Sequence, residues 1–119
     1  MDMALILFFP GPEKTTLAAV GGKGHSLIRL TEAGLPVPPG CVLTTEFFEP
    51  WFDEIKASAA WSALVKAAPD MWVSLCDELK GLCPALPLTA AQQQALTDLR
   101  TALAALDGNV RFAVRSSSP

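Results

Sequence analysis

The stretch AVGGKGHSLIRL, residues 19–30, places three glycines and a lysine directly before an apolar run with helical spacing. A glycine weakens a helix by about 1 kcal/mol relative to alanine, and a lysine in the first turn faces the positive end of the helix dipole. The spacing nevertheless predicts a helix from about Gly22 that ends at Gly34. Its apolar stripe contains Leu27, Leu30 and Gly34, with Ile28 beside it. Some other interaction must therefore compensate for this unfavourable helix start.

A phosphate is a suitable partner for this helix start. Backbone N–H groups at Gly22 and Gly24 and the positive end of the helix suit an anion, and Lys23 adds its own charge. The other interpretation is that Gly21 and Gly22 form only a turn while Lys23 points into solvent, because short glycine motifs are common without a ligand. The stretch is not a P-loop, since it lacks that motif's first glycine and the hydroxyl residue after its lysine.

Short strands are predicted at three other places. Residues 3–9 form an apolar run that Pro10, Gly11 and Pro12 close. Residues 41–44 follow the proline-rich GLPVPPG, which must be extended or turning. The alternating pattern of residues 110–115 predicts a further strand, with Arg115 at its tip.

Three more amphipathic helices are predicted after residue 44. The first begins at Thr44 or Thr45, where a hydroxyl caps it, and Pro50 predicts a kink or a restart. The second opens with Pro69 and ends at residues 80–81, and the third follows a capping box at Thr89. Strands interleaved with helices predict an α/β fold, with α+β as the alternative.

Composition and charge exclude several classes of protein. The 119 residues are 50% hydrophobic and carry a net charge of −3, which suits one domain or a piece of one. Lysines and arginines do not cluster, so no nucleic-acid partner is expected. The apolar run at residues 4–9 is far too short to cross a bilayer, so no membrane partner is expected either. Three cysteines without a CxxC pair indicate reduced thiols in a cytoplasmic protein.

Arg115 is a second candidate for binding a phosphate. Its planar donor fork is followed by three serines, and phosphate oxygens suit that fork. The other interpretation is an exposed charge at a fraying chain end. His25, the only histidine, has no cysteine or carboxylate at a ligand or triad spacing, and the acidic residues from 46 to 54 are typical of a helix start. We therefore expect no metal site and no catalytic residue in this stretch.

Two blocks of the sequence resemble a known family. VGGKGHSLIRLTEAGLPVPPGCVLTTEFF, residues 20–48, and FAVRSSSP, residues 112–119, are similar to the N-terminal blocks of the phosphoenolpyruvate synthase and pyruvate phosphate dikinase family, which includes rifampicin phosphotransferase. The sequence departs from the family pattern at His25, where a small or amide residue is usual, and at Cys41, where phenylalanine is usual. The region between the blocks is family-like only in length and pattern.

The resemblance implies that residues 1–119 are the N-terminal part of an ATP-grasp nucleotide-binding domain, a fragment of a larger multidomain enzyme. It also implies that Lys23 and Arg115, with Gly22 and Gly24 beside the lysine, contact the phosphates of ATP. Mg²⁺ is expected as a cofactor, with its ligands outside this stretch. The stretch by itself is then expected to be inactive.

The family's reaction implies the partners of this chain. The family transfers a phosphoryl group from ATP to a carrier histidine on another domain and then to an acceptor such as pyruvate. The implied partners are therefore ATP and the downstream carrier and acceptor domains of the same parent chain. The alternative is a stand-alone or degenerate module that binds a nucleotide or a partner without transferring a phosphoryl group.

Overall fold

The structure is a computed structural model that describes residues 4–12, 14–106 and 111–119. Within these ranges the chain forms two short β-strands, five α-helices and two 3-10 turns. The described elements are mostly helical with a small two-stranded sheet, which is compatible with the predicted α/β class and with its α+β alternative.

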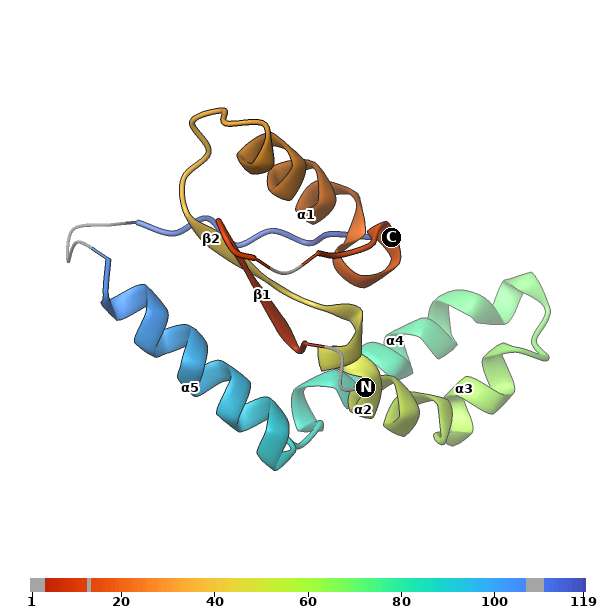
Figure 1. Ribbon diagram of the computed structural model, residues 1–119. Helices are drawn as coiled ribbons and strands as arrows, with labels where there is room; N and C mark the ends of the chain where they lie inside the picture. The colour runs from red at the N-terminus through yellow and green to blue at the C-terminus, as the bar shows by residue number, and fades with distance from the viewer. Residues whose placement is uncertain (1–3, 13, 107–110) are drawn as a thin grey trace. The chain divides into compact units, whose positions relative to one another are not determined.

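The chain divides into two compact units. The sheet unit comprises Met1–Phe47 and Ala90–Pro119, and the helical unit comprises Phe48–Thr89. In the sheet unit, β1 (Ile6–Phe9) and β2 (Gly40–Leu43) pair antiparallel in a two-stranded sheet (Figure 1). Both strands lie where the sequence predicts them, although each has only four residues.

The register of the sheet places Gly40 opposite Phe9. A Cβ at Gly40 would lie 2.6 Å from Cζ of the Phe9 ring, so a glycine here leaves the space that the ring occupies. The Phe9 ring therefore packs into the core of the sheet unit. That core contains four buried apolar side chains: Leu7, Phe9, Val20 and Ile28.

Helix α1 (Leu17–Glu32) consists of two helical parts. It begins earlier than predicted because the Thr16 side chain caps it, accepting a hydrogen bond from the Ala19 N–H at 3.3 Å. At Gly21 the backbone leaves the helical conformation, with φ 74° and ψ 174°. The start predicted near Gly22 is therefore the start of the second, longer part of α1.

The apolar face predicted for α1 is right for Ile28 and wrong for the two leucines beside it. Leu27 and Leu30 are 37% and 42% exposed, whereas Gly24 and Ile28 are buried. A Cβ at Gly24 would lie 3.2 Å from Cγ2 of Val42 in β2, so the small residue lets α1 approach the sheet closely on this side. Close packing thus selects the face that contains the glycine over the face that carries the leucines.

Residues 111–119 run in an extended course through the sheet unit and end beside the beginning of α1 (Figure 1). They contain no strand, so the prediction of a strand is wrong for residues 111–115, while Val110 lies outside the described residues. A strand requires a ladder of hydrogen bonds with a neighbour, and the described sheet has β1 and β2 as its two strands, with no ladder to residues 111–115. Phe112 and Val114 are 53% and 96% exposed.

Helix α5 (Ala90–Ala104) also belongs to the sheet unit and begins directly after Thr89, as predicted. Its Gln92 side chain is only 1% exposed, and Nε2 donates a hydrogen bond to the carbonyl oxygen of Phe47 at 2.7 Å. A buried amide is stable only with such partners. This hydrogen bond therefore joins α5 to residue 47 of the same unit.

Helix α2 (Thr45–Lys56) starts in the sheet unit and leads into the helical unit. It contains Pro50 in its interior and continues through it, so the restart predicted there does not occur. In the helical unit the indole N–H of Trp51 donates to the carbonyl oxygen of Pro87 at 2.9 Å. The remaining elements of this unit are α3 (Ala59–Leu64), η1 (Pro69–Met71), α4 (Trp72–Leu82) and η2 (Cys83–Ala85).

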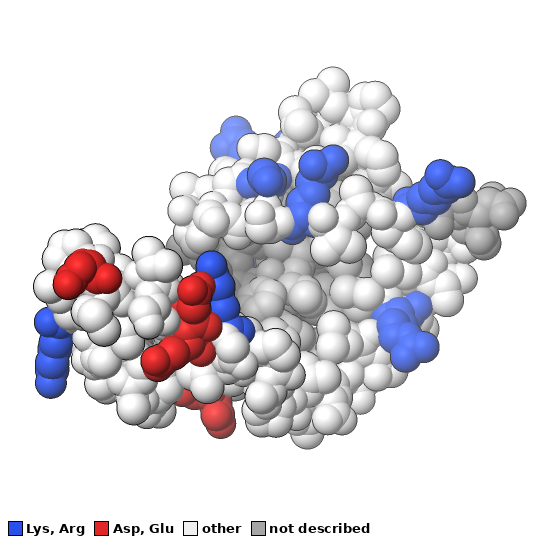
Figure 2. Space-filling model, turned by 180° about the vertical axis from the view of Figure 1, so that it is seen from behind, with Lys and Arg blue, Asp and Glu red and all other residues white. Residues whose placement is uncertain are grey.

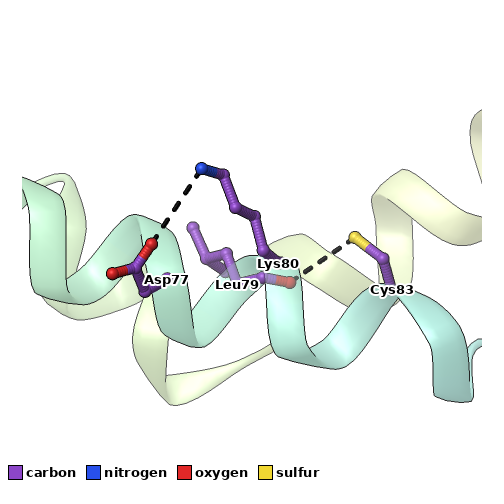
Figure 3. A network of polar contacts seen from close by, with 4 residues as sticks. All are labelled: Asp77, Leu79, Lys80 and Cys83. Atoms are coloured by element: carbon purple, nitrogen blue, oxygen red, sulfur yellow. Dashed lines mark hydrogen bonds and ion pairs between the residues drawn. The ribbon is translucent and has the colours of Figure 1, made fainter.

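The polar contacts at the end of α4 are local to that helix (Figure 3). Lys80 Nζ lies 3.9 Å from Asp77 Oδ1, and these side chains are 81% and 68% exposed. Cys83 Sγ donates to the carbonyl oxygen of Leu79 at 3.5 Å. An exposed ion pair contributes about 0–1 kcal/mol, so these contacts make a small contribution to helix stability. Across the described ranges, every helix is too short or too polar to cross a membrane.

Candidate functional site

The glycine stretch that the sequence predicts to face a phosphate folds around Gly21. Its φ of 74° lies in the left-handed region, where residues with side chains are strained. A Cβ at this position would also lie 2.5 Å from the carbonyl carbon, the carbonyl oxygen and Oγ of Ser117. Both the backbone conformation and the close approach of the C-terminal segment therefore require glycine here.

Ser117 and Ser118 bind the backbone of this turn. The N–H of Gly24 donates to Oγ of Ser117 at 3.0 Å, and the same hydroxyl donates to the carbonyl oxygen of Val20 at 2.6 Å. The N–H of Gly22 donates to the carbonyl oxygen of Ser118 at 2.7 Å. N–H groups at the start of a helix have no partner within the helix. The serines therefore supply partners at the position where the sequence predicts a phosphate.

The structure brings together the two segments that carry the predicted cations. Lys23 lies between two residues whose N–H groups bind the C-terminal segment, and Arg115 lies two residues before Ser117. Both Lys23 and Arg115 are exposed. In the part of the chain that the structure describes, the ion pair is between Lys80 and Asp77, so no carboxylate there neutralises either cation. Both side chains are therefore available to an anion.

Charge is divided unevenly between the two units. The sequence places six Lys or Arg and six Asp or Glu in the sheet unit, against three and six in the helical unit. In Figure 2 the acidic side chains in view lie over the helical unit. The sheet unit, which carries Lys23 and Arg115, therefore has no net negative charge that would repel a phosphate.

The two residues that depart from the family pattern both lie in secondary structure of the sheet unit. His25 is half-buried on α1, and Cys41 is half-buried in β2. Burial raises the pKa of the Cys41 thiol, so this side chain is uncharged at neutral pH. As far as the described residues extend, no three His, Cys, Asp or Glu side chains gather closely enough to hold a metal ion.

Sequence reasoning missed Ser117 and Ser118 as partners of the glycine turn. It considered the serines only as polar neighbours of Arg115. A signal was present, because serine is a common partner for N–H groups at a helix start. The bond between Ser117 and Gly24 spans 93 residues, however, and no local pattern specifies so distant a partner.

Comparison with known proteins gives a consistent set of matches. Residues 17–119 match the family model described as pyruvate phosphate dikinase, AMP/ATP-binding domain. The phosphoenolpyruvate synthase of Aeropyrum pernix is 29% identical over 125 residues, which cover 99% of this chain and 15% of that protein. No solved structure matches the chain significantly.

Two further relatives match shorter parts of the chain. The phosphoenolpyruvate synthase of Pyrococcus furiosus is 38% identical over 58 residues, which cover 49% of this chain and 7% of that protein. The probable phosphoenolpyruvate synthase of Methanothermobacter thermautotrophicus is 43% identical over 44 residues, which cover 37% of this chain and 6% of that protein. The chain therefore spans only a small fraction, at most 15%, of the length of these relatives.

Proposed function

This chain belongs to the pyruvate phosphate dikinase AMP/ATP-binding domain family, and from this we propose that it binds ATP as the N-terminal part of an ATP-grasp domain. In this proposal the parent protein is a phosphoenolpyruvate synthase-like phosphotransferase, in keeping with the names of the relatives, and it acts in the cytoplasm. Residues 1–119 are one part of that larger enzyme. The small share of each relative that the chain covers supports this division.

The observation that carries the proposal is the attachment of residues 117–118 to the glycine turn. Three hydrogen bonds of 2.6 to 3.0 Å link the segment that contains Arg115 to the turn that contains Lys23. Two cations from distant parts of the sequence are thereby held in one region of the sheet unit. A polyphosphate carries several negative charges close together, so it suits a pair of cations from two segments.

Lys23 and Arg115 bind and orient the phosphates of ATP in this proposal. In phosphoryl transfer most of the catalysis comes from positioning and from stabilising charge that develops on the phosphate oxygens. The phosphoryl group then passes to a carrier histidine on another domain and on to an acceptor such as pyruvate. Mg²⁺ supplies further charge neutralisation when it is bound. We expect its ligands in other parts of the parent protein.

Gly22 and Gly24 border the same phosphate site. Their N–H groups donate to Ser118 and Ser117, so a direct contact with a phosphate requires that these hydrogen bonds be shared or exchanged. Gly24 also allows close packing, because a Cβ at this position would lie only 3.2 Å from the Val20 Cβ. We therefore assign to the two glycines the shape of the turn around Lys23, with phosphate contact through their backbone.

The test is ATP-dependent formation of phosphohistidine in the complete protein. We expect Lys23→Ala and Arg115→Ala each to lower the rate at least tenfold, because each removes a charge from the phosphates. Lys14→Ala and Arg111→Ala are matched controls, since both replace exposed cations of the same unit. Undiminished transfer in the Lys23 and Arg115 variants would contradict the proposal.

The second candidate is a module that binds a nucleotide or a partner without phosphoryl transfer. The observation in its favour is that the chain's own serines already occupy N–H groups of the glycine turn. The same experiment separates the two functions. ATP binding that depends on Lys23 and Arg115, with no phosphohistidine at any ATP concentration, would favour the module.

A further inference from the structure

The Ser117 hydroxyl makes two hydrogen bonds to one turn of the backbone. It accepts from the N–H of Gly24 at 3.0 Å and donates to the carbonyl oxygen of Val20 at 2.6 Å. A serine hydroxyl has one proton and two lone pairs, so its single donor is fully used by this turn. The two bonds reach residues on both sides of Gly21, where the backbone leaves the helical conformation.

A second attachment lies next to the first. The N–H of Gly22 donates to the carbonyl oxygen of Ser118 at 2.7 Å. Lys23 therefore has a hydrogen-bonded residue on each side, and both of these bonds lead to the C-terminal segment. Serine and glycine together hold the backbone from which the Lys23 side chain extends.

Arg115 is only two residues before Ser117. Two residues of extended chain span about 7 Å, so the attachment of Ser117 limits the position of the Arg115 backbone to the neighbourhood of the glycine turn. The segment follows an extended course (Figure 1). The attachment of Ser117 therefore fixes the backbone two residues after Arg115 against the glycine turn.

From this geometry we propose that Ser117 is a positioning residue for the phosphates of ATP. Its hydroxyl forms hydrogen bonds on both sides of Gly21 and so holds Lys23 and Arg115 in an arrangement in which one polyphosphate contacts both side chains. The inference rests on the proposed function. Groups that are already in place when a ligand arrives lose less conformational freedom on binding, and the affinity rises accordingly. Without the two hydrogen bonds of the Ser117 hydroxyl, both cations remain, but their relative position is no longer maintained.

The test compares Ser117→Ala with Ser116→Ala in the complete protein. Ser116 is an exposed serine next to Ser117, so its variant controls for general effects on the segment. The affinities for ATP and for adenosine are measured by calorimetry. We expect Ser117→Ala to weaken ATP binding about tenfold, because the two cations must then be ordered on binding, and to leave adenosine binding unchanged. Ser116→Ala leaves both affinities unchanged.

Two outcomes would overturn the role of Ser117. One is ATP affinity in Ser117→Ala equal to that in Ser116→Ala. The other is an equal loss of ATP and adenosine affinity. General damage to the domain would weaken the binding of both ligands, whereas loss of the Ser117 hydrogen bonds would weaken only the binding of the phosphates. If Lys23→Ala and Arg115→Ala also leave ATP affinity unchanged, the proposed function itself is overturned. The two failures are thus distinguishable.

A pair of variants with the same shape covers the case in which Ser117→Ala does not fold. Ser117→Thr keeps a hydroxyl, whereas Ser117→Val replaces that hydroxyl with a methyl group, and both share any disturbance from the added branch. We expect the threonine variant to bind ATP about tenfold more tightly than the valine variant. Equal affinities in this pair would also overturn the proposal.

Discussion

The Ser117 hydroxyl donates a hydrogen bond of 2.6 Å to the carbonyl oxygen of Val20, although 97 residues separate the two in the sequence. Val20 is 2% exposed and belongs to the core of the sheet unit, so the bond attaches the C-terminal segment at a buried position. The same hydroxyl binds Gly24, beyond the break in α1. The hydrogen bonds of Ser117 therefore contribute both to the stability of the sheet unit and to the arrangement of the candidate site. Mutations can test the two contributions separately.

Gly21→Ala is expected to destabilise the protein more than Gly34→Ala. Both glycines have positive φ, 74° and 80°, so both variants incur strain of about 1–2 kcal/mol. Only at Gly21 does the added Cβ also meet Ser117, at 2.5 Å, whereas nothing lies within 4 Å at Gly34. The additional loss is expected to be about 1–3 kcal/mol. Urea unfolding measures both values, and equal losses would contradict the close approach of Ser117.

Ile28→Ala and Leu30→Ala test which face of α1 is buried. Ile28 is 8% exposed and lies in the core, so its truncation is expected to lower the free energy of unfolding by about 2–4 kcal/mol. Leu30 is 42% exposed, and its truncation is expected to cost less than about 1 kcal/mol. Thermal unfolding of the two variants is sufficient, and the reverse order would contradict the burial of Ile28 and the exposure of Leu30.

Gln92→Ala is expected to lower the free energy of unfolding by about 2–3 kcal/mol. The side chain is 1% exposed and donates to the carbonyl oxygen of Phe47, so the variant loses a buried hydrogen bond and leaves unfilled space. Gln94→Ala is the matched control on the same helix. Gln94 is exposed and bonds to Asp98 at 2.9 Å, an interaction of about 0.2–0.5 kcal/mol. Similar losses in the two variants would contradict the role of Gln92.

Alkylation with iodoacetamide is expected to modify Cys83 before Cys41. Cys83 is exposed, whereas Cys41 is half-buried in β2 and burial raises the pKa of its thiol. The thiolate is the reactive form, so a raised pKa lowers the reactive fraction of Cys41 at any pH below that pKa. Its rate should rise only at higher pH than for an ordinary thiol. Mass spectrometry follows both sites, and unfolding in urea should remove the difference.

Local signals predicted much of the fold. Strand β1 lies within the predicted residues 3–9, β2 begins one residue before the predicted residues 41–44, and α5 begins directly after Thr89, the residue predicted to cap it. These predictions depend on neighbours in the sequence: prolines beside short apolar stretches, and a hydroxyl residue before a helix. The start of a helical part at Gly22 belongs to the same class, because glycine conformation is a local property.

The errors have a common physical cause. The apolar face of α1 depends on Gly24 fitting against Val42, and periodicity cannot detect a fit between two distant surfaces. The strand predicted over residues 111–115 has the right alternation, but a strand also needs a neighbour with free backbone groups. Each error concerns a partner that lies far away in the sequence.

The sequence by itself predicted two of the short strands, the start of α5 and two candidate cations, Lys23 and Arg115, in separate segments. Only the tertiary structure decided that these segments meet, through the hydrogen bonds of Ser117 and Ser118 to the glycine turn. The reason is that caps, turns and periodicity arise from interactions between near neighbours in the chain. The hydrogen bond between Ser117 and Gly24 joins residues 93 positions apart. It forms only when the folded backbone brings the Ser117 hydroxyl to the Gly24 N–H group.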